Sequence, residues 1–284
     1  MRLDYFPPSP PMRPLLTMHA VVHAVDRPHH AVLPAMLPNL HVRLSGHCSY
    51  RFAGGEPVAA PPVALIGPTR HAYRMDFGPG FRMLSIGLLP AGWMSLVQAP
   101  GHECADRLFA GDDLWGASAV DRLLAQLHAR PLDGRHTGVM EAFVAAASRA
   151  PGERPLQQLQ AVDRWLEGSA SLSLDELSAS LGVGARQMRR ITEDSHGLSP
   201  KALAMKYRAL RTAAALSQRD PCAPGQAVEQ ALLLYADQSH AIRDFQRFIG
   251  WTPAAFGREP RGIARATLAG RHRAGAHRPL ALLS

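Results

Sequence analysis

The second half of the chain is punctuated by residues that start and stop helices at short intervals. Ser173 followed by Glu176 is a capping box, in which the hydroxyl and the carboxylate each satisfy a free backbone N–H group. The helix that this box opens is expected to end at Gly182, and a second helix is expected over residues 185–196. Ser199-Pro200 then caps and opens a long third helix. Two helices joined by a tight glycine turn at this spacing predict a helix-turn-helix unit.

The second helix of this unit is expected to be amphipathic, at about 100° of rotation per residue. Its inward face holds Met188, Ile191, Thr192 and Ser195, and its outward face holds Arg186, Arg189, Arg190 and Glu193. Guanidinium groups bind guanine O6 and N7 in the major groove of DNA, and they also bind phosphates. A solvated arginine face is the usual explanation for such a helix on its own. The preceding cap and turn favour a DNA-reading helix here.

A similar unit follows further along the chain. Asp237 is expected to cap a helix over residues 238–249, and Thr252-Pro253 to open a last short helix. The inward face of residues 238–249 holds Ala241, Phe245, Phe248 and Ile249, and the outward face holds Ser239, His240, Arg243 and Arg247. Two such units joined by one long helix are expected to place their recognition helices in successive major grooves, about 34 Å apart.

The segments 177–200 and 235–256 resemble the two halves of the DNA-binding domain of AraC-type transcriptional regulators. The resemblance covers about residues 155–258, and two different motifs occur in the right order and at the right separation. It implies a seven-helix DNA-binding domain that is usually preceded by a sensor or dimerisation domain. The base-reading residues that it implies are Arg186, Arg189 and Arg190 in the first unit and Gln238, Ser239, His240 and Arg243 in the second.

The chain departs from the family pattern at several positions. Thr192 stands where the family usually has an aromatic residue, and Leu234 where it usually has glycine. Gln230 stands near an expected alanine, and Pro221 and Pro224 precede this stretch. These departures predict a less filled core in the first unit and a second unit that either packs differently or reads DNA weakly.

The first half is expected to be rich in β-structure. Residues 41–52 alternate apolar and polar side chains as a strand does, and residues 63–66, 72–77 and 81–89 are further strand candidates. Helices are expected near residues 112–129 and 137–149. Residues 65–69 and 81–90 resemble the β-rich, cupin-like sensor domains found ahead of some AraC-type units. The predicted fold class is therefore α+β: a cupin-like barrel or sandwich with trailing helices, followed by an all-α double helix-turn-helix domain.

Charge and punctuation divide the 284 residues into three parts. Pro151-Gly152 marks a boundary, which predicts an effector or dimerisation domain over residues 1–150 and a DNA-binding domain over residues 155–258. The formal net charge is +8, and residues 260–284 hold five arginines and no acidic residue. Gly, Ala and Pro are interspersed there, which predicts a basic flexible tail. This tail is expected to be either a solvated terminus without further role or an arm that touches phosphates nonspecifically.

Several other classes of protein find no support in the sequence. No apolar run reaches the ~18 residues of a membrane span, and no secretory signal is evident, so we expect a cytoplasmic protein with no membrane partner. Three cysteines are too few and too scattered for a disulfide framework or a zinc knuckle. Ten of the 14 histidines lie in the first 150 residues, but without a usual metal-ligand spacing. We therefore expect no catalytic residues, no metal and no cofactor.

Together these patterns predict a sequence-specific transcriptional regulator rather than an enzyme. Its expected partners are double-stranded DNA, a small-molecule effector, a second copy in a homodimer, and RNA polymerase if it activates transcription. One alternative is a cupin-type metal-dependent enzyme with a helical accessory domain. Another is an architectural DNA-binding protein without an effector.

Overall fold

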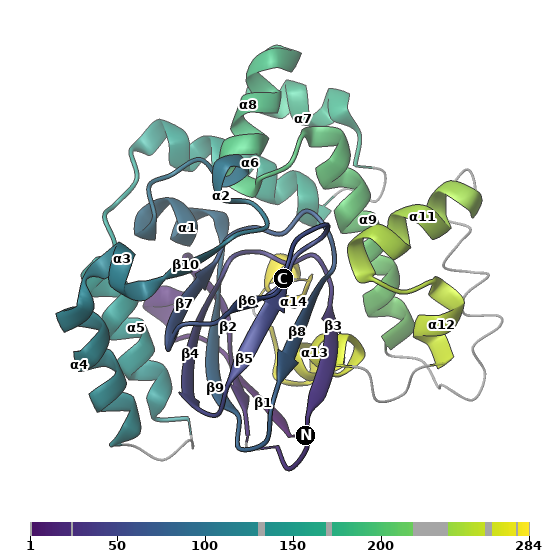
Figure 1. Ribbon diagram of the computed structural model, residues 1–284. Coiled ribbons are helices and arrows are strands. Elements are labelled where there is room, and N and C mark those ends of the chain that lie inside the picture. Colours follow the sequence, from purple (N-terminus) through teal and green to yellow (C-terminus); the bar gives the residue numbers. More distant parts are fainter. Residues whose placement is uncertain are drawn as a thin grey trace.

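The computed structural model describes residues 2–23, 25–129, 134–168, 172–217, 238–258, 263–276 and 278–283. Its N-terminal half is built around two β-sheets, and its C-terminal half is helical (Figure 1). The predicted α+β class, with a β-rich part followed by a helical part, is confirmed. None of the helices in these ranges is both long and apolar enough to cross a membrane.

The strands form a six-stranded sheet of order β1-β2-β9-β4-β7-β10 and a four-stranded sheet of order β3-β8-β5-β6, with antiparallel pairing throughout. Their bounds are β1 Leu3–Phe6, β2 Leu16–Val22, β3 His29–Leu33, β4 Asn39–Ser45, β5 Cys48–Arg51, β6 Val58–Ala59, β7 Val63–Ile66, β8 Tyr73–Phe77, β9 Arg82–Leu88 and β10 Leu108–Ala110. A short 3₁₀ helix, η1, spans Pro10–Met12. Apolar side chains from both sheets share one core, so the sheets face each other.

The stretch 41–52, expected as one strand, is two strands in different sheets. The chain turns at Gly46, whose φ of +70° lies in the left-handed region that favours glycine. A Cβ at this position would lie 2.6 Å from the Cα of Phe81, so a side chain cannot fit there. Period-two alternation continues through the turn, which is why the sequence alone does not reveal the break.

Helices that come after β9 in the chain cover the outer face of the six-stranded sheet (Figure 1). They are α1 Pro90–Leu96, α2 Gly101–Cys104, α3 Gly111–Trp115, α4 Ala117–His128 and α5 His136–Ala147. The expected helix at 112–129 is broken at Gly116, where φ is +81°. Trp93 and Met140 are fully buried in the core between this sheet and its helices.

The helical half has its own core, in which α9 is central. Its elements are α6 Glu153–Gly168, α7 Leu174–Leu181, α8 Ala185–His196, α9 Pro200–Ser217, α11 Gln238–Ile249 and α12 Pro253–Arg258. The predicted cap is present, since the Glu176 amide donates to Ser173 Oγ at 3.5 Å. Residues 218–237, which hold Pro221, Pro224, Gln230 and Leu234, lie outside the described residues.

The C-terminal segment differs from the expected flexible tail. It forms α13 Ile263–Arg273 and α14 Pro279–Leu283, which pack on β1, β2, β3, α6 and α9. Ala264, Leu268 and Leu280 are buried. These apolar residues recur at intervals among glycines and arginines. They form a core only because strands of both sheets and the helices α6 and α9 pack against them.

The arginines of this segment are also engaged with the protein. Arg265 is 6% exposed and donates to the Gly257 carbonyl at 3.2 Å, and Arg271 is 4% exposed. Arg278 pairs with Glu167 at 2.6 Å and with Asp163 at 3.3 Å, both on α6. These three side chains are therefore not available to phosphates in the way that a mobile arm would make them.

A buried carboxylate on α5 fastens the N-terminal segment to the β-rich half. Glu141 accepts hydrogen bonds from the Ser9 amide at 2.9 Å, the Ser9 hydroxyl at 2.5 Å and His19 Nε2 at 3.0 Å. Burial alone would raise the pKa of Glu141, but these hydrogen bonds lower it from 4.5 to about 2.

We expect Glu141→Gln to lower the free energy of unfolding by roughly 1–3 kcal/mol at pH 7, because a charged hydrogen-bond acceptor is lost from a buried site. The folded-state pKa is below the unfolded one, so the stabilisation is present above pH 4.5 and is lost as the pH falls towards 2. Urea denaturation of wild type and variant at several pH values should therefore show a difference that shrinks below pH 4.5. Glu56→Gln, at an exposed position, is the control. A pH-independent difference would contradict this account.

Candidate DNA-binding surface

The first helix-turn-helix unit consists of α7 and α8, and its turn is made by Gly182. This glycine has a φ of +61° and donates to the Ser178 carbonyl at 3.0 Å, which closes α7. The Ser178 hydroxyl donates to the Val183 carbonyl at 2.9 Å and holds the turn. A left-handed glycine directly after the last helical turn is a common way to end a helix. It directs the chain into α8, which begins at Ala185 as expected.

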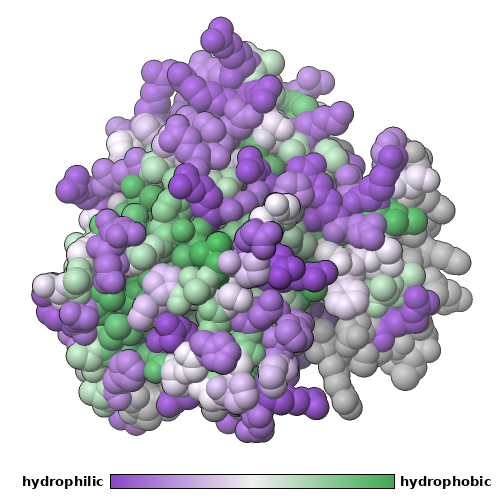
Figure 2. All heavy atoms as spheres, viewed as in Figure 1, coloured by the Kyte–Doolittle hydropathy of each residue, from purple (hydrophilic) through white to green (hydrophobic). Residues whose placement is uncertain are grey.

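The two faces of α8 are those that the sequence predicted. Met188, Ile191, Thr192 and Ser195 are buried, whereas Arg186, Arg189 and Arg190 are exposed. Figure 2 shows hydrophilic side chains crowded over the part of the surface where α7 and α8 lie. Glu193 is half-buried and binds Arg189 Nε at 2.7 Å, an i, i+4 pair along the helix.

The helix predicted as the second recognition helix is α11. Ala241, Phe245, Phe248 and Ile249 are each at most 1% exposed, whereas Ser239, His240, Arg243 and Arg247 are exposed. Arg243 Nε donates to the Ser239 carbonyl at 3.3 Å, one turn earlier. Gln238 is the first residue of α11, but its side chain lies outside the described residues, as does the expected cap Asp237.

One helix joins the two units. The 18 residues of α9 span about 27 Å at 1.5 Å per residue, and both α8 and α11 pack against this helix. Phe245 of α11 meets Phe256 of α12 edge to face, with 5.7 Å between ring centroids. Thr192, in place of the usual aromatic residue, is fully buried, and its hydroxyl donates to the Arg189 carbonyl at 3.0 Å.

Sequence reasoning missed a buried lysine in α9. Lys206 is 1% exposed, and its Nζ donates to the carbonyls of Met36 at 2.9 Å and Thr69 at 3.1 Å, both in the β-rich half. Burial lowers the pKa of Lys206 from 10.5 to about 7. A clue was present in the sequence, because the chain has only two lysines among 31 basic residues, and Lys206 falls on the apolar side of α9.

A Ser-His-Asp arrangement that sequence reasoning did not identify lies between the last turn of α8 and α6. Ser195 Oγ lies 2.7 Å from His196 Nδ1, and His196 Nε2 lies 3.5 Å from Asp163 Oδ1. All three residues are buried, and the Ser195 hydroxyl also hydrogen-bonds the Ile191 carbonyl at 2.6 Å. A nucleophile needs a free hydroxyl that a substrate can reach, which the buried Ser195 hydroxyl is not.

Among the hollows that the described residues of the β-rich half form, two lie beside the strands. A narrow cavity of about 60 Å³ lies between the sheets, with Met36, His41, Tyr73 and Arg271 among its lining residues. Burial lowers the pKa of His41 to about 3, so this side chain is neutral at pH 7, and its Nδ1 lies 2.6 Å from the Tyr50 hydroxyl.

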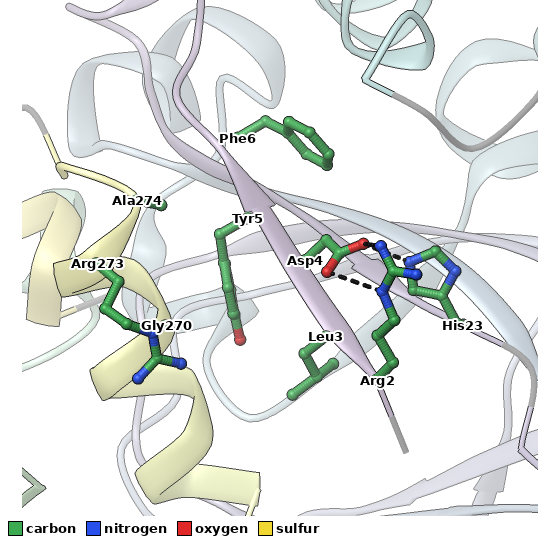
Figure 3. A pocket seen from close by; sticks show the side chains of 9 residues that line it. All are labelled: Arg2, Leu3, Asp4, Tyr5, Phe6, His23, Gly270, Arg273 and Ala274. Carbon is green, nitrogen blue, oxygen red and sulfur yellow. Dashed lines mark hydrogen bonds and ion pairs between the residues drawn. The ribbon is translucent and has the colours of Figure 1, made fainter.

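The other hollow is an open surface pocket of about 650 Å³ between β1 and α13 (Figure 3). Asp4 binds Arg2 and His23 on one side of it, and Arg273 extends from α13 on the other side of Tyr5. A Cβ at Gly270 would lie 2.5 Å from Tyr5 Cε2, so only glycine lets α13 lie this close to β1.

Among the residues that the structure describes, no three His, Cys, Asp or Glu side chains are grouped so as to hold a metal ion. The histidines of the first half instead have separate neighbours. His19 meets Glu141, His23 meets Asp4 and His30 meets Asp76.

No protein-family model matches the chain, and no curated protein matches it in sequence. The backbones of several solved structures are similar to that of this chain. One is ToxT from Vibrio cholerae, with 8% identity, a TM-score of 0.46, and coverage of 84% of this chain and 97% of that one. ToxT bound to (E)-4-(8-methylnaphthalen-1-yl)but-3-enoic acid has 9% identity, a TM-score of 0.47, and coverage of 90% and 97%. A third is CuxR, described as an AraC-like transcriptional activator, with 14% identity, a TM-score of 0.29, and coverage of 74% and 86%. Because these sequence identities and TM-scores are low, the proposed function rests on the residues of this chain itself.

Proposed function

We propose that the chain is a sequence-specific, DNA-binding transcriptional regulator of the AraC type. The observation that carries this proposal is the pair of helices α8 and α11, which pack on one linking helix and each expose a polar, arginine-bearing face. Arg186, Arg189 and Arg190 would contact bases or phosphates from α8, and Gln238, Ser239, His240 and Arg243 from α11. Residues 155–258 would be the DNA-binding domain.

The β-rich half, residues 1–150, would bind a small effector or a second copy of the chain. The interior cavity supports an effector, since it combines apolar side chains with a few polar groups, as binding sites for small molecules do. At about 60 Å³ the cavity is much smaller than the roughly 300–1,000 Å³ that is usual for a ligand pocket, so an effector would have to displace side chains there. RNA polymerase would be a further partner if the protein activates transcription.

The proposal is tested by incubating the purified full-length protein with sheared genomic fragments and sequencing those it retains. A regulator of this kind should enrich fragments that share one motif with two parts, one for each recognition helix. Retention of fragments without a shared motif would support the architectural alternative. No retention, together with stoichiometric bound zinc or iron, would support the metal-dependent enzyme.

We expect the two parts of the motif to contribute unequally to affinity, because Gln230 and Leu234 depart from the family pattern just ahead of α11. Base substitutions under α8 should cost about 1–3 kcal/mol each, and those under α11 less. Electrophoretic titrations with duplexes substituted one base pair at a time measure this directly. Equal losses in both parts would reject the prediction.

A further inference from the structure

One loop of the β-rich half contacts the helical half at three separate points. This loop, residues 67–72 between β7 and β8, is called the bridging loop here. Its Pro68 packs against Gly197 at the end of α8, its Thr69 carbonyl accepts from Lys206 in α9, and its Ala72 amide donates to the Arg247 carbonyl near the end of α11. Both recognition helices and the helix between them therefore meet the same six residues.

The β-rich half supplies hydrogen-bond donors to the last carbonyls of α11. The last carbonyls of a helix lack partners within the helix. Here the Ala35 amide donates to the Phe248 carbonyl at 2.6 Å, and the Ala72 amide donates to the Arg247 carbonyl at 2.8 Å. Gly250 follows with a φ of +85°, and a Cβ there would collide with Val32 of β3. Rotation of α11 about α9 would break both hydrogen bonds.

The end of α8 is also held by the β-rich half. Helix α2 packs against it, with Gly101 close to the backbone of Asp194 and Gly197, and His102 Nδ1 lies 3.3 Å from Asp194 Oδ1. The bridging loop supports α2 in turn, because Asp106 accepts from the Arg70 amide and from Arg70 Nε, both at 2.8 Å.

Lys206 joins these contacts in the middle. Its Nζ donates to the carbonyls of Met36 and Thr69, and these two residues are bound to each other. The Met36 amide donates to Thr69 Oγ1 at 2.7 Å, and the Thr69 amide donates to the Met36 carbonyl at 3.2 Å. A buried lysine nitrogen is tolerated only where it is hydrogen-bonded. Lys206 reaches these partners only when α9 is packed on the β-rich half. It therefore specifies one packing arrangement of α9, which a general apolar contact would not do.

We infer that the bridging loop, with Lys206 as its positioning residue, determines the relative orientation of α8 and α11 and hence the half-site spacing that the protein accepts. The part about DNA spacing rests on the proposed function, whereas the part about orientation does not. Met36 and Tyr73, which flank these contacts, also line the interior cavity. A ligand in that cavity would therefore contact Met36 and Tyr73, in the two segments that hold the recognition helices.

The orientation is tested without DNA by spin-label distance measurements on the full-length protein. Nitroxides on Ala185→Cys and Gln246→Cys, at exposed positions of α8 and α11, report the distance between the helices, with Cys222→Ser to prevent a third label. We expect a narrow distance distribution in wild type and a clearly broader or shifted one in Lys206→Met. Lys201→Met, at the chain's other lysine, which is exposed at the start of α9, should leave it narrow.

A distribution in Lys206→Met that matches wild type would overturn the inference. If Lys206→Met does not fold, Thr69→Val provides the test, because it removes the hydroxyl that binds the Met36 amide and keeps the side-chain volume. Broadening in that variant supports the inference, and an unchanged distribution rejects it.

The DNA part is tested with duplexes in which two base pairs are inserted between the two halves of the selected motif, which rotates one half by about 70° around the axis. We expect wild type to lose at least about tenfold in affinity on this insertion, and Lys206→Met to lose less than about threefold. An equal loss in both proteins would overturn the spacing claim. If neither protein binds specific DNA, the proposed function fails, and the distance measurement still decides whether Lys206 positions the helices.

Discussion

Deletion of residues 260–284 is expected to lower the free energy of unfolding by more than about 4 kcal/mol, because a buried leucine alone contributes about 2–5 kcal/mol and this segment buries two. Leu268 of α13 and Leu280 of α14 are at most 2% exposed, and Arg278 pairs with two carboxylates of α6. Since domains are stable by about 5–15 kcal/mol, the shortened protein should unfold at much lower urea concentration or aggregate.

A point variant separates packing from simple loss of charge in this segment. Leu268→Ala should destabilise the full-length protein by about 2–5 kcal/mol, whereas Arg273→Ala, at an exposed position, should change the stability by less than about 0.5 kcal/mol. A mobile basic arm would behave differently. Its removal would leave the melting temperature unchanged and flatten the slope of log K against log salt by about 0.9 for each phosphate that the arm had neutralised. That result would contradict the packed α13 and α14.

The combined variant Arg186→Ala, Arg189→Ala and Arg190→Ala is expected to lower affinity for the selected DNA motif by at least about a hundredfold, since each bidentate base contact contributes about 1–3 kcal/mol. The three side chains are exposed on one face of α8, so the fold should be unaffected. Titration of specific and random duplexes with wild type and variant, together with thermal denaturation, measures both effects.

The matched control for this variant is the removal of an exposed arginine elsewhere, and Arg122→Ala on α4 serves the purpose. It should leave the affinity close to that of wild type. An equal loss on specific and random duplexes would mean that the three arginines hold phosphates rather than read bases. Unchanged affinity for the motif would show that α8 is not a recognition helix.

Local sequence signals were enough to predict the first helix-turn-helix unit. A cap at Ser173, a left-handed glycine at 182 and the 3.6-residue spacing of Met188, Ile191 and Ser195 act over a few residues, so they have the same meaning in any fold. The faces of α8 and α11 and the ends of α8 were predicted for the same reason. Strands 63–66, 73–77 and 82–88 were likewise recognisable from short apolar runs bounded by turns.

Other features depend on contacts between residues far apart in the sequence. The fold of residues 263–283 was missed because its apolar residues are sparse, and only the sheets and α9 complete their core. The break at Gly46 is required by the approach of Phe81, 35 positions later.

The role of Lys206 is decided by tertiary structure in the same way. Its hydrogen-bond acceptors are backbone carbonyls, at Met36 and Thr69, and a carbonyl is present at every residue whatever its side chain. The position of Lys206 on the apolar side of α9 hints that it is buried, but no sequence pattern marks the carbonyls that accept from it. The amphipathic faces of α8 and α11 could be derived from their own residues. The contacts that the bridging loop makes with both helices exist only in the folded chain, because they are made largely by backbone groups that come together from distant segments.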